Sequence, residues 1–340
     1  MTRNTTLALA CASAATALVS GCDFAKLAAE QTADVLARAE PSIEREEDIG
    51  IAEAAIAANL KLFEGLIEVS PKKKVLYTLT AQAFGSYAFG FLDPRIESIS
   101  DPLDPTRKMY VSRAMSCYRR GRGYAEKWMA FKVKDIAAKL HGPRDGALAA
   151  IAALDKKMVP GLFWAGYNWA QLINLRVDEL EPAATGTPVP ADDDSGDVSA
   201  APPPPSGVEG SAEGEIEVAK AIMGRVVELD ETYFNASAHS VLGVMEGVIP
   251  KSLGGRADES LKHFDRAIAL TGGKFLLPKV FKAQFWATNV GDRAAFVALL
   301  KEVIDAPPDL FPDQRLANEL AKGRAHALLA QIDTLFVSGS

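Results

Sequence analysis

Apolar residues recur three and four positions apart along nearly the whole chain, and this spacing limits the possible folds more than any other feature. In segment 24–70, for example, Ile56, Leu60, Phe63 and Ile67 follow one another at intervals of four, three and four residues, which places them on one face of a helix. Alternating apolar and polar runs, which are typical of half-buried strands, are nearly absent. The sequence therefore predicts an all-α fold, and its short connections indicate antiparallel neighbouring helices.

The helical pattern is interrupted at points rich in Gly and Pro. Segment 75–91 is nearly all apolar or small, so we expect a helix that is buried on most sides. Asp-Pro pairs begin at positions 93, 101 and 104 and predict a loop over 93–105, because helix is disfavoured in the residue before a proline. Helical patterns resume over 106–139, 147–181, 215–229, 232–248, 256–271, 274–289, 291–305 and 312–337.

Residues 182–214 differ in composition from the rest of the chain. Pro, Gly, Ser, Ala and Asp dominate them, and few large apolar residues are present to offset the entropy lost on ordering. The segment is predicted to be a disordered insertion that acts as a spacer, although its PPPP run would also suit a polyproline ligand. It would divide one helical domain into an N-terminal part, 22–181, and a C-terminal part, 215–340.

The first 21 residues have the pattern of an export signal. Arg3 precedes an uncharged apolar run that is shorter than the roughly 20 residues of a membrane-spanning helix, and small residues close the run. The letters LVSGC, ending at Cys22, resemble the lipobox of bacterial lipoproteins, in which the cysteine is lipidated and becomes the first residue of the mature protein. The segment therefore predicts a lipid anchor on Cys22, and an ordinary cleaved signal in which Cys22 has no role is the alternative.

Charge and cysteine content narrow the classes of function. A net charge of −7 leaves no basic excess to displace counterions from phosphates, which argues against a nucleic-acid partner. Cys11 would leave with the signal and Cys22 would carry lipid, so Cys117 would have no partner for an intrachain disulfide. A mature chain of this size can be held by its apolar core instead. Beyond the signal no run reaches membrane-spanning length, so the predicted anchoring rests on lipid alone.

The sequence contains no arrangement that is typical of catalysis or of metal binding. None of its four histidines lies within metal-ligand spacing of another His or Cys. The segment that ends at Lys274 lacks the first glycine of a phosphate loop, and Ser70 to Lys73 match an acylating SxxK motif by letters only. We therefore expect no metal, no cofactor and no enzymatic activity.

Helix-pair repeats are the remaining signal. Ser260, Phe264 and Ala267 are spaced like the small, aromatic and small residues of a second tetratricopeptide helix, where the small residues would let the partner helix approach and Phe264 would fill the gap between two stacked hairpins. Leu242 and Gly243 suit the first helix of the pair. The turn after Gly243 is longer than in a regular repeat, so the repeat is degenerate. A second set of this kind lies in segment 114–121 and is preceded by TLTAQAF. These sets predict a tetratricopeptide-like bundle of stacked helix pairs.

Three blocks, at 117–125, 159–175 and 253–287, together resemble the TRAP transporter TatT component family. With the lipobox included, the likeness covers most of the mature chain, whereas the insertion at 182–214 departs from the family pattern. The resemblance implies a periplasmic lipoprotein with a tetratricopeptide-like fold that serves tripartite ATP-independent periplasmic transport. It also implies binding to the periplasmic solute receptor and a homotrimer with a channel through each protomer.

The tryptophan-bearing block supplies the first candidates for a ligand site. On a helix, Trp164 shares a face with Tyr167 and with Asn168, whereas Trp169 points elsewhere, so the cluster is predicted to line a cavity on one side and to pack on the other. Large ligand pockets usually have such aromatic and apolar walls. The complete set of candidates is Trp164, Tyr167, Asn168, Trp169, Phe285, Trp286, Arg119 and Arg122. The alternatives are core packing for the aromatic residues and a solvated basic face for the arginines.

Two hypotheses for function follow from the sequence. The first is a non-enzymatic, lipid-anchored periplasmic protein that docks a solute receptor and binds or passes a small apolar or amphiphilic molecule. The second is a tetratricopeptide lipoprotein that acts as a scaffold for an envelope complex. A closed pocket would favour the first hypothesis, and a wide open concave face would favour the second.

Overall fold

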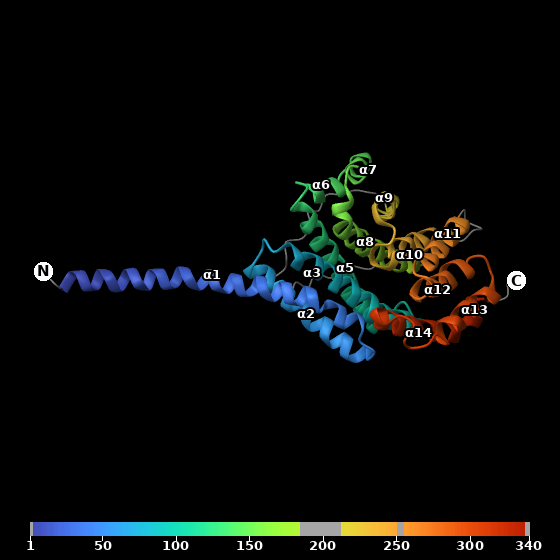
Figure 1. Cartoon of the computed structure of the whole chain (residues 1–340). Helices are drawn as coiled ribbons and strands as arrows, with labels where there is room; N and C mark the ends of the chain where they lie inside the picture. The colour runs from blue at the N-terminus through green and yellow to red at the C-terminus, as the bar shows by residue number, and fades with distance from the viewer. Residues whose placement is uncertain (1–2, 184–211, 250–254, 337–340) are drawn as a thin grey trace.

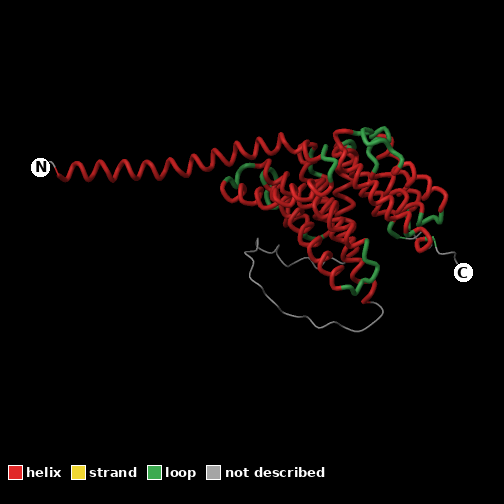
Figure 2. Tube along the Cα trace, turned by 90° about the horizontal axis from the view of Figure 1, so that it is seen from below, coloured by secondary structure: helices red, strands yellow, loops and turns green. Residues whose placement is uncertain are grey.

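The computed structural model of the chain describes residues 3–183, 212–249 and 255–336. Helices joined by short loops make up these ranges, and none of the described residues forms a strand (Figure 2). The predicted all-α class is therefore confirmed. The longer helices are α1 (Arg3–Glu44), α2 (Ile49–Val69), α3 (Lys74–Tyr87), α5 (Pro105–Ala130), α8 (Val159–Ala183), α9 (Ala212–Asp230), α10 (Tyr233–Gly247), α11 (Ala257–Leu270), α13 (Arg293–Ile304) and α14 (Arg315–Ala330).

Short helical segments connect the longer ones. They are η1 (Ala88–Leu92), α4 (Asp93–Glu97), α6 (Ile136–Leu140), α7 (Arg144–Ala152), η2 (Lys156–Met158), α12 (Leu277–Phe281), η4 (Lys282–Ala287), η5 (Pro312–Gln314) and α15 (Ile332–Leu335). Most of the predicted insertion, 184–211, lies outside the described residues, and helix reaches into both ends of the predicted segment, to Ala183 and from Ala212. No helix of the described part is long and apolar enough to cross a membrane.

The N-terminal helices differ from the prediction at their junction. The helical pattern over 24–70 is divided between α1 and α2, because Asp48 caps the start of α2 by accepting hydrogen bonds from the backbone N–H groups of Gly50 and Ile51 at 2.8 and 3.0 Å. The predicted apolar face of α2 is buried at Ile56 and Phe63. The first half of α1 projects away from the body of the protein (Figure 1).

The loop predicted over 93–105 is wrong in its first part. Asp93 has helical dihedral angles, and α4 continues directly from η1. Pro94 therefore lies inside a continuous helical stretch, where the backbone changes from π-helical to α-helical. The rest of the prediction agrees with the structure, since α5 starts only after Asp104, whose side chain caps the backbone N–H groups of Thr106 and Arg107.

Small residues allow close contact between helices at two places. In the pair α10 and α11, the ring of Phe264 lies against Gly243, where an added Cβ would approach the ring to 2.7 Å, and Ser260 Oγ donates to the carbonyl oxygen of Gly243 at 2.7 Å. Where α3, α5 and α8 meet, the side chain of Asn168 lies against Gly121. Phe264 therefore packs against Gly243, within the helix pair itself.

The C-terminal helix α14 returns to the N-terminal end of the chain. It contacts α1 and α2 as well as α12 and α13, and Figure 1 shows it next to α2. Ion pairs join the two ends of the chain, among them Arg45 with Asp313 at 3.1 Å and Arg324 with Glu97 at 2.6 Å. The helices therefore close around the space between α8, α10 and α14.

Candidate functional site

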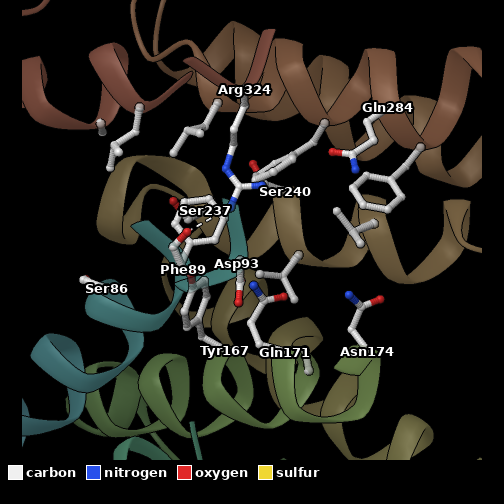
Figure 3. A pocket seen from close by; sticks show the side chains of 18 of the residues that line it. Ser86, Phe89, Asp93, Tyr167, Gln171, Asn174, Ser237, Ser240, Gln284 and Arg324 are labelled. Atoms are coloured by element: carbon white, nitrogen blue, oxygen red, sulfur yellow. Dashed lines mark hydrogen bonds between the residues drawn. The ribbon is translucent and has the colours of Figure 1, made fainter. Parts of the chain in front are cut away.

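A cavity of about 270 Å³ lies in this space between the N-terminal and C-terminal helices (Figure 3). Its walls come mainly from α8, α10, α14, η1 with α4, and α12 with η4. A second cavity of about 240 Å³ lies among α1, α2 and α3. Both cavities are lined by Glu44, Ile56 and Ser86, so they adjoin at these three side chains.

Aromatic rings form much of the wall of the larger cavity. On α8, Trp164 contacts Tyr167 with a distance of 5.5 Å between ring centroids, and the ring of Phe234 lies 4.8 Å from Trp164. On η1, the ring of Phe89 lies 6.4 Å from Tyr167 and 6.0 Å from Phe281. The rings therefore present a continuous apolar surface to the cavity, as ligand pockets commonly do.

Two π-helical segments, η1 and η4, contribute side chains to this wall. Phe89 and Phe91 of η1 and Gln284 and Phe285 of η4 line the cavity. A π-helical turn contains an additional residue, which changes the direction of the following side chains, and such turns occur frequently at functional sites. In both segments the irregular backbone thus lies beside the cavity.

The start of α10 is strained at the cavity wall. Phe234, Asn235 and Ala236 have φ angles of 47°, 55° and 57°, in the left-handed region, which costs an L-residue about 1–2 kcal/mol. Packing holds the conformation, since the ring of Phe234 lies 5.3 Å from that of Phe163 and 4.8 Å from that of Trp164. Strain of this kind is concentrated at ligand sites, where surrounding structure maintains it.

Arg324 provides a positive charge at the opposite wall of the cavity. Its guanidinium group donates to Glu97 Oε1 at 2.6 Å and to the carbonyl oxygen of Phe89 at 2.8 Å, and it lies 4.4 Å from the centre of the Phe89 ring. Burial alone would lower the pKa of Arg324, but the negative charges of Glu97 and Asp93 have the larger effect together and raise it. Asp93 also accepts a hydrogen bond from the buried Tyr118 hydroxyl at 2.5 Å. Arg324 is therefore held by protein groups on several sides.

A pair of carboxyl groups lies where the two cavities meet. Glu44 lines both cavities, and Glu40, one turn earlier on α1, lines the smaller one. Burial, followed by the charge of Glu40 and a hydrogen bond to it, raises the pKa of Glu44 to about 8. Glu44 is therefore largely protonated at neutral pH.

Three of the residues predicted for the site line the larger cavity. They are Trp164 and Tyr167 on α8 and Phe285 on η4. Trp164 is almost completely buried and also lines the cavity, so it belongs both to the core and to the cavity wall. Helical spacing brings the two α8 aromatics to one cavity wall, and the fold adds Phe285 to the lining of the same cavity.

The other candidates lie outside the lining. Asn168 is buried between α3 and α5, where its Nδ2 donates to the carbonyl oxygen of Trp164 at 2.7 Å. Trp169 packs against the His141 ring at 4.8 Å and lies under the guanidinium of Arg122, also at 4.8 Å, while Trp286 is beside the C-terminal apolar cluster. Arg119 is exposed on α5.

Sequence reasoning missed several residues of the cavity, chiefly Phe89, Ser240, Gln284 and Arg324. The sequence around each of these residues has the pattern of any helix in a bundle, so it gave no indication that the side chain lines a cavity. Arg324 in particular lies 227 residues from Glu97, its partner. No spacing rule connects residues at that separation.

Comparison with known families identifies this architecture. A family model for the TRAP transporter T-component matches residues 45–189 and 209–336. The chain belongs to this family. Residues 190–208, between the two matched segments, fall within the predicted insertion. No curated protein matches the chain.

Membership of the T-component family defines the general role of the chain. It is an accessory protein of a TRAP transport system and is associated with the cell envelope. The family is not known for enzymatic activity, and the described residues contain no group of three or more His, Cys, Asp or Glu side chains that would suit a metal ion.

Proposed function

We propose that this T-component is a lipid-anchored periplasmic protein that docks the solute receptor of its TRAP transporter and binds a small apolar or amphiphilic molecule in the larger cavity. The observation that carries the proposal is the cavity itself, with the rings of Trp164, Tyr167, Phe89 and Phe281 on its walls. The lipid would be attached to Cys22 after removal of residues 1–21. By resemblance to the family, the protein would act as a homotrimer.

Energetics support a ligand in the cavity. Empty apolar space inside a folded protein costs roughly 24 cal/mol for each Å³, so an apolar ligand that fills the cavity of about 270 Å³ would stabilise the protein. A scaffold protein needs only an outer surface and gains nothing from this space. The closure of α14 onto α1 and α2 also favours an enclosed site over an open concave face.

Receptor docking is tested by cross-linking in the native envelope. The lipidated protein is cross-linked in cells that contain its own TRAP receptor and is then purified through an affinity tag at the C-terminus. We expect the receptor among the captured proteins, and in larger amount when the transporter is induced. Absence of the receptor, together with capture of envelope-assembly proteins, would favour the scaffold hypothesis instead.

A further inference from the structure

The charges that line the larger cavity are mostly acidic. Asp93 and Glu97 belong to the lining, and Glu44 adds a carboxyl group that is largely protonated at neutral pH, whereas Arg324 is the one basic side chain among the described lining residues. That guanidinium is engaged by Glu97 at 2.6 Å and by the Phe89 carbonyl at 2.8 Å. A carboxylate ligand would have to displace Glu97 from Arg324 or remain near other carboxyl groups, and like charges repel strongly in a site of low dielectric constant.

Uncharged hydrogen-bonding groups also line the cavity. Gln171 and Asn174 extend from α8 on one side, and Gln284 extends from η4 on the other (Figure 3). The amide groups of these side chains can each donate and accept hydrogen bonds. They can therefore bind the head group of a neutral ligand from two walls.

Ser240 provides an independent indication that a polar ligand group enters the cavity. It lines the cavity and is only 4% exposed. Its Oγ is buried and has no hydrogen-bond partner among the described residues. Leaving a buried hydroxyl group unsatisfied costs about 1–3 kcal/mol, and a hydrogen-bonding group of a ligand would remove that cost.

We propose that the ligand of this cavity is an uncharged amphiphile with a hydroxyl or amide head group, bound by Gln171, Asn174, Ser240 and Gln284, and that the cavity selects against carboxylates. The aromatic walls would hold the apolar part of the molecule. This proposal rests on the ligand-binding part of the proposed function and names its ligand class.

The test compares two probes that share a chain length and differ in charge, decanamide and decanoate. Their binding to the full chain with Cys22→Ser, purified without detergent, is measured by isothermal titration calorimetry at pH 7.5. We expect decanamide to bind at least tenfold more tightly than decanoate. Gln284→Leu should weaken decanamide binding several-fold, whereas the matched control Gln331→Leu, at an exposed position beyond α14, should leave it unchanged.

A second variant tests the role assigned to charge. Glu97→Gln removes the acidic partner of Arg324. The affinity for decanoate should therefore rise at least several-fold, whereas the affinity for decanamide should change little. Equal or tighter binding of decanoate to the unsubstituted cavity would overturn the proposed selectivity. Failure of both probes to bind would overturn the ligand class and the ligand-binding role together. Receptor docking is measured separately by cross-linking, so its failure would be distinguishable from either result.

Discussion

Glu44 should make the stability of the protein fall as the pH rises, and replacing it should remove this effect. A carboxyl group whose pKa is raised to about 8 keeps its proton in the folded state at pH values where the unfolded chain has already lost it. The contribution of Glu44 to stability is therefore greatest below the unfolded pKa of about 4.5 and decreases up to about pH 8. The amide introduced by Glu44→Gln does not ionise, so the variant should lack this dependence of stability on pH.

The expected size of the effect follows from the raised pKa. One pKa unit corresponds to about 1.4 kcal/mol, so ionising Glu44 would cost the folded state at most on the order of 4–5 kcal/mol. Solvent in the adjoining cavities and the interaction with Glu40 reduce this cost, so we expect Glu44→Gln to stabilise the protein by roughly 2 kcal/mol at pH 8.5. At pH 5 the variant and the parent protein should be nearly equally stable.

The assay is urea denaturation followed by circular dichroism at pH 5 and at pH 8.5. The matched control is Glu68→Gln, at an exposed position on α2. A change in the free energy of unfolding that is the same at both pH values for Glu44→Gln would refute the assignment of the raised pKa. If Glu44→Gln were less stable than the parent protein at pH 8.5, the protein would be shown to bind the ionised carboxylate favourably.

Three further substitutions test other parts of the structure. Gly121→Ala places a Cβ 2.5 Å from Asn168 Oδ1, so it should destabilise the protein by about 1–3 kcal/mol; adding Asn168→Ala should recover part of this loss in a double-mutant cycle, and strict additivity would contradict the contact. Arg324→Met removes the hydrogen bonds to Glu97 and to the Phe89 carbonyl, so we expect a loss of about 2–3 kcal/mol in urea denaturation, and an unchanged midpoint would contradict it. Cys22→Ser should move the protein from the membrane fraction to the soluble fraction or leave it unprocessed, whereas continued membrane attachment would contradict the lipid anchor.

Local spacing was sufficient to assign residues to the two helices of a pair. Ser260, Phe264 and Ala267 indicated the second helix and Gly243 the first, whereas the direct packing of Phe264 on Gly243 is seen only in the structure. Interruptions of helices were harder to predict when neither Gly nor Pro marks them. The pattern over 106–139 predicted one helix, but α5 ends at Ala130 and α6 begins only after Asp135, which has a φ of 58°.

The cavity could be predicted only in part, because it depends on how distant segments close upon one another. Helical periodicity placed Trp164 and Tyr167 on one face, yet the same periodicity could not decide whether that face meets a neighbouring helix or open space. Trp169 and Asn168, from the same block, were drawn into contacts with α5 and α3 instead. The return of α14, which brings Arg324 to Glu97, has no signature in local sequence.

Native mass spectrometry of the protein, recovered from the envelope of its own cells without added ligand, tests most directly whether the larger cavity is a ligand site. The cavity-filling substitution Ala317→Trp, on α14, is compared with Ala149→Trp at an exposed position on α7. We predict that the parent protein and Ala149→Trp retain one small organic molecule per protomer and that Ala317→Trp does not. An equal amount of retained molecule in folded Ala317→Trp, or none in the parent protein, would contradict a ligand-binding role for this cavity.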